Sequence, residues 1–477
     1  MLIVTTIIIY FCVLMLMGRL TSRKSDNETF YRGERKSPWY VLAFGLVGAS
    51  ISGITFVSVP GMVIGQQMTY LQTCLGFILG YFVVAFVLLP VYYKLNLTTI
   101  YSYLKKRLGK RSYKTGAMFF LLSEMTGTAL RFYVVCSILQ RFVFGYFGLP
   151  FGVTVVVLVM LIWLYTRRGG IKTLVWTDTF QTFCMMTALV IIIMEVIGKL
   201  DMSVGDAVRA VAADAHSRVF VFDDWVSTQN FFKQFLSGVF IVVVMTGLDQ
   251  HMMQKNLTCK SLRDAQKDMC VGGFFFVPVN LLFLSLGVLL LLLAQKEGLA
   301  IPADSDELLP MFAASGRMGS LVLVLFSIGI VAASFSGTDS ALTAVTTSFC
   351  VDIKERPADE ALRRKAHLGI CLLFAAFILL FRALNSTSVI DAIYIILSYT
   401  SGPLLGLFAY GIVTRRPVND RLVPYICVAS PVVCFVIDFT TKALTGYQFG
   451  YELLILNGAI VFCGLYLTGG KQTTAKA

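Results

Sequence analysis

Residues 43–65 read AFGLVGASISGITFVSVPGMVIG, an apolar stretch that glycine, serine and proline interrupt several times. A helix needs about 20 apolar residues to cross the hydrocarbon core of a bilayer, so the stretch is long enough to do so. Glycine is unfavourable inside a helix, and Pro60 removes one helical hydrogen bond. The sequence therefore predicts a membrane helix that is broken near its middle.

Residues 240–254, FIVVVMTGLDQHMMQ, have the same character, because Thr246 and Gly247 are followed by Asp249. Unwound segments at corresponding positions of two halves point to the central site of transporters built from inverted repeats. We count five spans from the first broken helix to the next, and an odd number makes the two start on opposite sides. Two inverted five-helix repeats are predicted. Two unrelated kinked helices remain the alternative, since glycine and proline are common in membrane helices.

The composition is that of a membrane protein throughout. Of 477 residues, 57% are hydrophobic and 14% are charged, against about 25% charged in soluble domains. Backbone groups in hydrocarbon must pair internally, so long apolar stretches predict helices. The first stretch lacks a basic leader and a small-residue cleavage site, so we interpret it as a helix and not a signal peptide. The thirteen expected spans lie near 2–18, 38–64, 69–93, 115–140, 150–166, 174–198, 234–253, 271–294, 318–350, 366–384, 388–413, 423–441 and 451–468.

The net charge of +13 indicates how the chain is oriented in the membrane and does not indicate nucleic-acid binding. Most of the 40 Lys and Arg residues fall in alternate loops, including 19–36, 94–114, 255–267 and 354–365. Lys255 and Arg363 are counted among these loop charges. Cytoplasmic loops are rich in Lys and Arg, so we expect the N-terminus outside, the C-terminus inside, and a multi-pass protein of the cell (inner or plasma) membrane. The partners expected are lipid and small solutes, with no nucleic acid and no obligate protein partner.

Residues 332–353, AASFSGTDSALTAVTTSFCVDI, place many hydroxyl groups inside the ninth span. At helical spacing Ser336, Ser340, Thr343 and Thr347 form one stripe, with Asp339 beside it. Hydroxyl groups alone favour bonding to the preceding turn and close helix packing. A carboxylate within a membrane helix is costly and is usually paired or functional. We therefore interpret the stripe as a source of oxygen ligands for Na⁺.

Two further charged residues lie inside spans. Asp178 is either a second cation ligand or a carboxylate stabilised by the start of its own helix. Arg131 lies well inside the fourth span, where an arginine costs about 2.5–3.5 kcal/mol or more. The planar guanidinium group of Arg131 can bind a carboxylate through two parallel hydrogen bonds. This favours an acidic solute. Pairing with Glu124, or extension to the membrane surface, is the alternative.

The other reactive residue types indicate neither an enzyme nor a resident cofactor. The 11 cysteines are scattered through the spans, and the 3 histidines are far apart in sequence. Buried cysteine commonly serves as a small apolar residue. We therefore predict no catalytic residues, no cofactor, and no metal other than Na⁺ as coupling ion.

Five motifs in order resemble the sodium:solute symporter family, from about residue 30 to residue 415. They are YYKLNLTTIYSYLKKRLG (92–109), GGIKTLVWTDTFQ (169–181), DQHMMQKNLTCKS (249–261), the hydroxyl-rich helix, and SGPLLGLFAYGI (401–412). The resemblance implies an all-α membrane fold with a five-plus-five inverted-repeat core of the leucine-transporter type. The parts would be 1–37 (first helix and basic loop), 38–199 (first repeat), 200–230 (external loop), 231–413 (second repeat) and 414–477 (two further helices and tail).

The resemblance also implies two sodium sites. The first would use backbone carbonyls of Gly48, Ile51 and Ala333 with the side chain of Ser336. Gly337 stands where the family usually has a second serine, so one ligand of this site is missing.

The second site, which some members have, would use Asp178, Ser336, Asp339 and Ser340. Asp339 stands where a hydroxyl group is often found, which would make this site more anionic.

Candidate solute residues are Ser52 and Thr55 in the second span, Tyr70 and Gln72 in the third, and Arg131. Sialic-acid members of the family carry an arginine in the region of Arg131 that takes the substrate carboxylate. Ordinary packing is the alternative role for the other four side chains.

The predicted function is sodium-coupled import of a small polar organic solute, such as the acidic sugar sialic acid, by alternating access. Alternatives of the same fold are a proton-coupled transporter, with Asp178 or Asp339 titrating, and a neutral-sugar transporter. A membrane sensor and an intramembrane enzyme are less favoured.

Overall fold

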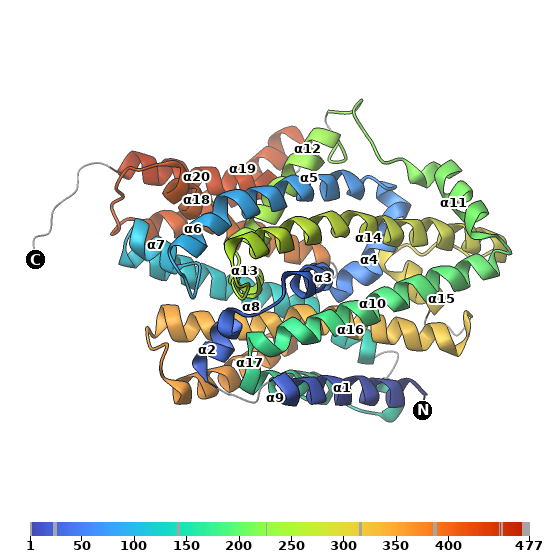
Figure 1. The fold of residues 1–477 in the computed structure, drawn as a ribbon. Coiled ribbons are helices and arrows are strands. Elements are labelled where there is room, and N and C mark those ends of the chain that lie inside the picture. The colour runs from blue at the N-terminus through green and yellow to red at the C-terminus, as the bar shows by residue number, and fades with distance from the viewer. Residues whose placement is uncertain are drawn as a thin grey trace, which may run out of the picture.

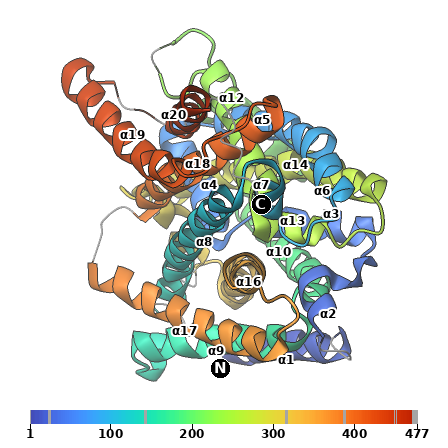
Figure 2. The same cartoon turned by 90° about the vertical axis from the view of Figure 1, so that its left-hand side faces the viewer.

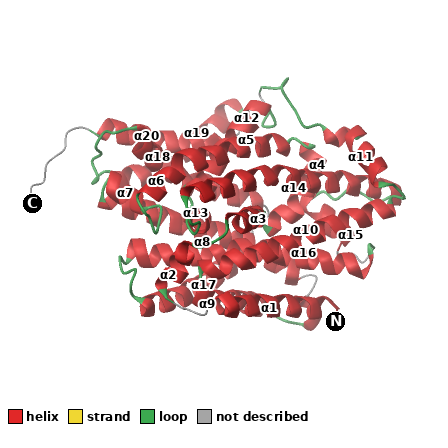
Figure 3. Ribbon diagram, viewed as in Figure 1, coloured by secondary structure: helices red, strands yellow, loops and turns green. Residues whose placement is uncertain are grey.

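The structure is a computed structural model that describes residues 2–21, 26–140, 144–225, 227–313, 317–384, 389–447, 449 and 452–469. Within these residues the regular structure is helical, apart from one isolated bridge between Ser37 and Cys259 (Figure 3). A helix satisfies its own backbone hydrogen bonds, which is what an apolar chain in hydrocarbon requires.

Each of the thirteen predicted spans coincides with a helix or a pair of helices. Eight of the described helices are long and apolar enough to cross a membrane, or ten if each bent pair forms one span. The helices are α1 (Leu2–Thr21), α3 (Trp39–Ser50) with α4 (Gly53–Gln66), α5 (Tyr70–Val83) continuing to α6 (Leu89–Lys94), α8 (Lys110–Leu139), α9 (Phe151–Gly169), α10 (Ile171–Lys199), α12 (Phe231–Val242) with α13 (Gln250–Asn256), α14 (Leu262–Glu297), α16 (Gly319–Ser348), α17 (Glu360–Leu384), α18 (Val389–Val413), α19 (Val423–Thr445) and α20 (Glu452–Thr468).

Short helices lie at the two ends of the bundle. At one end, on the left of Figure 1, are α2 (Asn27–Arg32) and α7 (Ser102–Arg107). At the other end are α15 (Leu308–Ala313) and α11 (Val204–Ala213). The helix α11 lies within the predicted external loop. Large apolar side chains remain exposed on the long helices, as expected of a surface that faces lipid; examples are Phe183, Val428, Phe435 and Phe439.

The hydroxyl-rich helix α16 occupies the interior of the bundle. Figure 2 looks along it and shows α8, α10 and α17 around it. Its second half is almost completely buried, and α10 packs along it. The polar side chains of α16 are therefore held among other helices and away from the lipid.

The first predicted break is present between α3 and α4, which are bent by 57°. Ile51 and Ser52 are extended there, and Ser52 Oγ accepts a hydrogen bond from the backbone N–H of Thr55 at 3.3 Å. Ser52 is thus the N-cap of α4. Among the described residues, no other helix forms a hydrogen bond with the backbone of Ile51 or Ser52.

The second predicted break lies between α12 and α13, which are bent by 70°. Asp249 Oδ1 accepts the backbone N–H of His251 at 2.7 Å and so caps α13. The Tyr92 hydroxyl donates to the Gly247 carbonyl at 2.9 Å, and the Tyr101 hydroxyl donates to the Leu248 carbonyl at 3.0 Å. Neighbouring helices therefore satisfy backbone groups that the break leaves unpaired.

Two basic residues that were counted as loop residues lie in helices instead. Lys255 lies within α13 and is 5% exposed, and Arg363 lies within α17 and is fully buried. The Arg363 guanidinium stacks over the ring of Phe30, with its carbon 4.6 Å from the ring centroid. A basic residue next to a span was taken for a loop residue because hydropathy alone does not reveal such partners.

Close helix contact between α5 and α12 requires glycine. A Cβ on Gly76 would overlap the carbonyl oxygen of Phe235, and one on Gly238 would overlap that of Thr73. The helix α12 leads into the second break, and α5 packs against α12. The spacing of these two helices therefore determines where the break lies.

We expect Gly76→Ala to destabilise the protein by about 1–3 kcal/mol, since the added methyl group forces the two backbones apart. Thermal unfolding in detergent measures the change. Gly198→Ala is the matched control, because nothing lies within 4 Å of a Cβ at that position. Equal melting temperatures for the two variants would contradict the packing argument.

Candidate functional site

A cavity of about 210 Å³ lies between the two broken helices, α5, α8 and α16. Four of the five predicted solute residues line it: Ser52, Thr55, Tyr70 and Arg131. Ser52 Oγ and Thr55 Oγ1 lie 3.2 Å apart and bond to each other. The first break of the fold thus exposes hydroxyl groups to a cavity that also contains a guanidinium group.

Gln72 does not line this cavity. Its side chain is fully buried, and its Oε1 accepts the backbone N–H of Val221 at 3.1 Å. Its Nε2 donates to the carbonyl of Gln229 at 2.9 Å. Both partners lie between α11 and α12, so Gln72 fastens this segment to α5.

Arg131 lines the cavity, is half-buried, and forms no hydrogen bond or ion pair with a described residue. Arg131 forms no direct ion pair with Glu124, whose Oε1 lies 3.2 Å from His251 Nδ1 and accepts the Thr128 hydroxyl at 3.0 Å, but its charge acts on the Glu124 carboxylate from farther away. The guanidinium is therefore available to an anionic ligand in the cavity.

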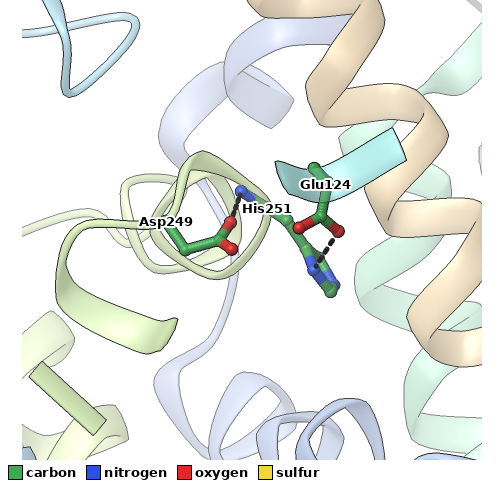
Figure 4. A group of neighbouring side chains, drawn as sticks. All are labelled: Glu124, Asp249 and His251. Carbon is green, nitrogen blue, oxygen red and sulfur yellow. Dashed lines mark hydrogen bonds and ion pairs between the residues drawn. The ribbon is translucent and has the colours of Figure 1, made fainter. Parts of the chain in front are cut away.

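Sequence reasoning gave no functional role to Glu124, Asp249 and His251, which meet at the cavity wall (Figure 4). Glu124 comes from α8, while the other two come from the second break. One ligand atom from each lies within 4.8 Å of the others, a grouping that could hold a cation. The signal in the sequence is that Glu124 precedes Arg131 by two helical turns and so shares its face of α8.

The elements of the first predicted sodium site are adjacent. The start of α4 contacts α16 so closely that a Cβ on Gly53 would overlap Ser334 Oγ. Ala333 lines the cavity, and the backbone of Ile51 has no hydrogen bond from another helix among the described residues. Gly48 packs against Thr182 of α10.

Gly337 also lines the cavity, and nothing lies within 4 Å of a Cβ placed on it. The missing serine of the first site is therefore replaced by open space and not by another side chain.

The four residues of the second predicted site lie together between α10 and α16. Ser336 Oγ donates to Asp178 Oδ1 at 2.8 Å, and Ser340 Oγ donates to Asp339 Oδ1 at 3.2 Å. The Tyr165 hydroxyl, from α9, donates to Asp339 Oδ2 at 2.6 Å. Both carboxylates are buried and bonded.

Lys255 completes this group. Its Nζ lies 2.7 Å from Asp178 Oδ2, and the two side chains are 6% and 2% exposed. A buried carboxylate needs a positive charge nearby, and the ammonium group of Lys255 supplies it. A sodium ion at Asp178 therefore has to compete with this ammonium group.

The hydroxyl groups of α16 form two kinds of hydrogen bond. Thr347 donates to the carbonyl of Thr343 at 2.8 Å, and Ser334 donates to that of Ile330 at 2.5 Å. Ser336 and Ser340 instead donate to the two carboxylates. Thr347 therefore bonds within its own helix, as the packing interpretation expects, whereas the role of Ser336 and Ser340 as Na⁺ ligands stays a prediction.

Residues 30–420 match the model of the sodium:solute symporter family. The chain belongs to the sodium:solute symporter family. The sodium/sialic acid symporter SiaT of Proteus mirabilis is 23% identical over 430 residues, covering 85% of this chain and 84% of that protein. The human sodium/iodide cotransporter is 25% identical over 419 residues, covering 83% of this chain but 62% of that longer protein.

A solved structure confirms the fold. The substrate-bound, outward-open structure of a Na⁺-coupled sialic acid symporter superposes with a TM-score of 0.82, at 20% identity and 98% coverage of both chains. The resemblance seen in the five motifs is thus confirmed. The protein is a multi-pass membrane transporter whose activity class is sodium:solute symport, and it is not an enzyme.

We expect Lys255→Met to destabilise this transporter by about 3–5 kcal/mol, because Asp178 then stays buried without a counter-charge. The double variant Lys255→Met/Asp178→Asn should recover most of the loss, since neither charge remains. Thermal unfolding in detergent gives both values. A double variant no more stable than Lys255→Met would show that the ion pair is not the source of the effect.

Proposed function

We propose that the protein imports a small organic acid, such as sialic acid or a related sugar acid, together with Na⁺ by alternating access. Arg131 carries this proposal, because its guanidinium lines the cavity and forms no hydrogen bond or ion pair with a described residue. An unpaired arginine inside a membrane helix costs about 2.5–3.5 kcal/mol or more. A ligand carboxylate, bound through two parallel hydrogen bonds, would offset that cost in the loaded state.

The relatives support an anionic solute. Sialic acid and iodide, the solutes in the names of the two similar proteins, are both anions. Ser52 and Thr55 add hydroxyl groups that can bond a hydroxylated solute, and Tyr70 lies in the same cavity wall. A carboxylate at Arg131 with hydroxyl groups toward α4 is the arrangement that uses all four residues.

We place the coupling sodium ion at the first site, between carbonyls of Gly48, Ile51 and Ala333 and the hydroxyl of Ser336. The free backbone at the first break supports this placement. An ion there would join the break to α16 and fix Ser52 and Thr55 at the cavity wall. Solute would then bind more tightly, and by linkage so would sodium.

A second sodium ion, at Asp178, Ser336, Asp339 and Ser340, would require the Lys255 ammonium group to leave Asp178. We therefore assign this site an auxiliary role, filled only in the state of the cycle in which α13 moves away from α10.

The topology that goes with this function has thirteen crossings, with the N-terminus outside and the C-terminus inside. In Figure 1, α1 begins at one end of the bundle and α20 ends at the opposite end. The basic helix α7 lies at the end where α20 stops. The repeats 38–199 and 231–413, each opening with a broken helix, would rock against each other to open the cavity to alternate sides.

Purified protein in liposomes should accumulate labelled sialic acid under an inward Na⁺ gradient and not under a K⁺ gradient. Arg131→Gln should weaken the apparent affinity at least about tenfold, since hydrogen bonds to a charged group contribute about 1.5–3 kcal/mol. Arg209→Gln, at an exposed position of α11, is the control. Full competition by neutral sugars but not by carboxylates would refute an acidic solute. Uptake that ignores Na⁺ and follows a pH gradient would identify the proton-coupled alternative.

We expect Gly337→Ser to raise the apparent Na⁺ affinity roughly fivefold, because it adds one oxygen ligand worth about 1 kcal/mol where space is open. The sodium dependence of uptake measures this change. Gly369→Ser, on the exposed face of α17 and equally uncrowded, is the control. An unchanged sodium dependence in Gly337→Ser would place the coupling ion elsewhere.

A further inference from the structure

Three acceptor atoms at the cavity wall lack a donor. Glu124 Oε1 accepts the Thr128 hydroxyl and lies 3.2 Å from His251 Nδ1. Asp249 Oδ1 accepts the backbone N–H of His251. No described donor contacts the second oxygen of either carboxyl group, although the two carboxyl groups lie within hydrogen-bond reach of each other. His251 Nε2 is buried without a hydrogen-bond partner, on a side chain that is 7% exposed and lines the cavity.

The positive charge of Arg131 acts on both carboxyl groups of this cluster without forming an ion pair with either. Glu124 and Asp249 place carboxylates within 4.8 Å of each other, and no described Lys or Arg lies within ion-pair distance of either. Asp178, by contrast, has the ammonium group of Lys255. Two carboxylates this close away from bulk water repel each other unless a cation or a proton lies between them. The cluster therefore needs a cation or a proton in direct contact with it, and no described Lys or Arg supplies one.

A primary ammonium group matches this need. It carries one positive charge and three N–H donors, and the cluster offers three free acceptors. A sodium ion would leave the nitrogen of His251 unused, because hard cations prefer oxygen ligands. A divalent transition metal or a shared proton would also fit, but neither explains why the cluster lines the same cavity as Arg131.

The backbone spacing along α8 gives a first measure of the distance between the two ends of the solute. Glu124 and Arg131 share one face and are seven residues apart, roughly 10 Å along the axis at 1.5 Å per residue. The ammonium and carboxylate groups of an α-amino acid are too close together to reach both. An acid with its amine several bonds away can do so.

We propose that Glu124, Asp249 and His251 bind a primary ammonium group of the solute while Arg131 binds its carboxylate. The cargo is then a zwitterion with well-separated charges, such as a sugar acid with a free amino group. This inference rests on the proposed function, which it narrows: an N-acetylated acid would leave the three acceptors without a donor.

The test is competition for Na⁺-driven uptake in liposomes by three matched probes: 6-aminohexanoate, its N-acetyl derivative and hexanoate. We expect 6-aminohexanoate to compete at least tenfold better than the other two, and glycine to compete poorly. Glu124→Gln should abolish the advantage of the free amine and leave competition by hexanoate within about twofold. Glu28→Gln, at an exposed position of α2, is the control.

The wild-type comparison alone decides the question if Glu124→Gln fails to fold. Equal competition by the three probes, with Na⁺-driven uptake and the effect of Arg131→Gln intact, overturns the ammonium subsite and leaves the proposed function standing. Absence of Na⁺-driven uptake of any acid is the separate result that overturns the proposed function. Inhibition by Zn²⁺ or Mn²⁺ that Glu124→Gln removes, without a preference for the amine, would overturn the inference in favour of a metal site.

Discussion

The ion pair between Asp178 and Lys255 is the contact on which the central part of the molecule depends. It joins α10 to α13, and Ser336 extends it to α16. Charges in the interior of a membrane protein are costly unless they are paired, so the pair holds these three helices together in this structure. Because α13 also carries His251 and is capped by Asp249, the same pair fixes part of the wall of the solute cavity.

The two predicted ion sites and the cavity share one helix, which links them mechanically. Ala333 and Gly337 of α16 line the cavity, while Ser336 lies on a different face and reaches Asp178. A shift of α16 by a fraction of a helical turn would therefore change the lining of the cavity and the contact with Asp178 at once. This shared element gives a physical basis for coupling between cation and solute that requires no contact between the two ligands.

The sequence was sufficient for the features that follow from local chemistry. Glycine and Asp249 marked both broken helices, whereas Pro60 lies inside α4 and not at the break. Hydropathy located the helices, and Arg131 stood out by its cost. Lys255 was misplaced because a lysine beside a span looks like a loop residue until its partner is known. Gln72 was misassigned to the solute because its partners belong to a segment far along the chain. Glu124 and His251 meet only through the packing of α8 against the second break, which periodicity does not reveal.

The two broken helices differ in how they are held. Tyrosine hydroxyl groups and Gln250 tie the second break to its neighbours, whereas the backbone of the first break, at Ile51 and Ser52, bonds to no other helix among the described residues. Segments with few external bonds open at lower free energy. Amide hydrogens next to Ile51 should accordingly exchange with deuterium sooner than those around Leu248, which makes the first break the more pliable hinge of the pair.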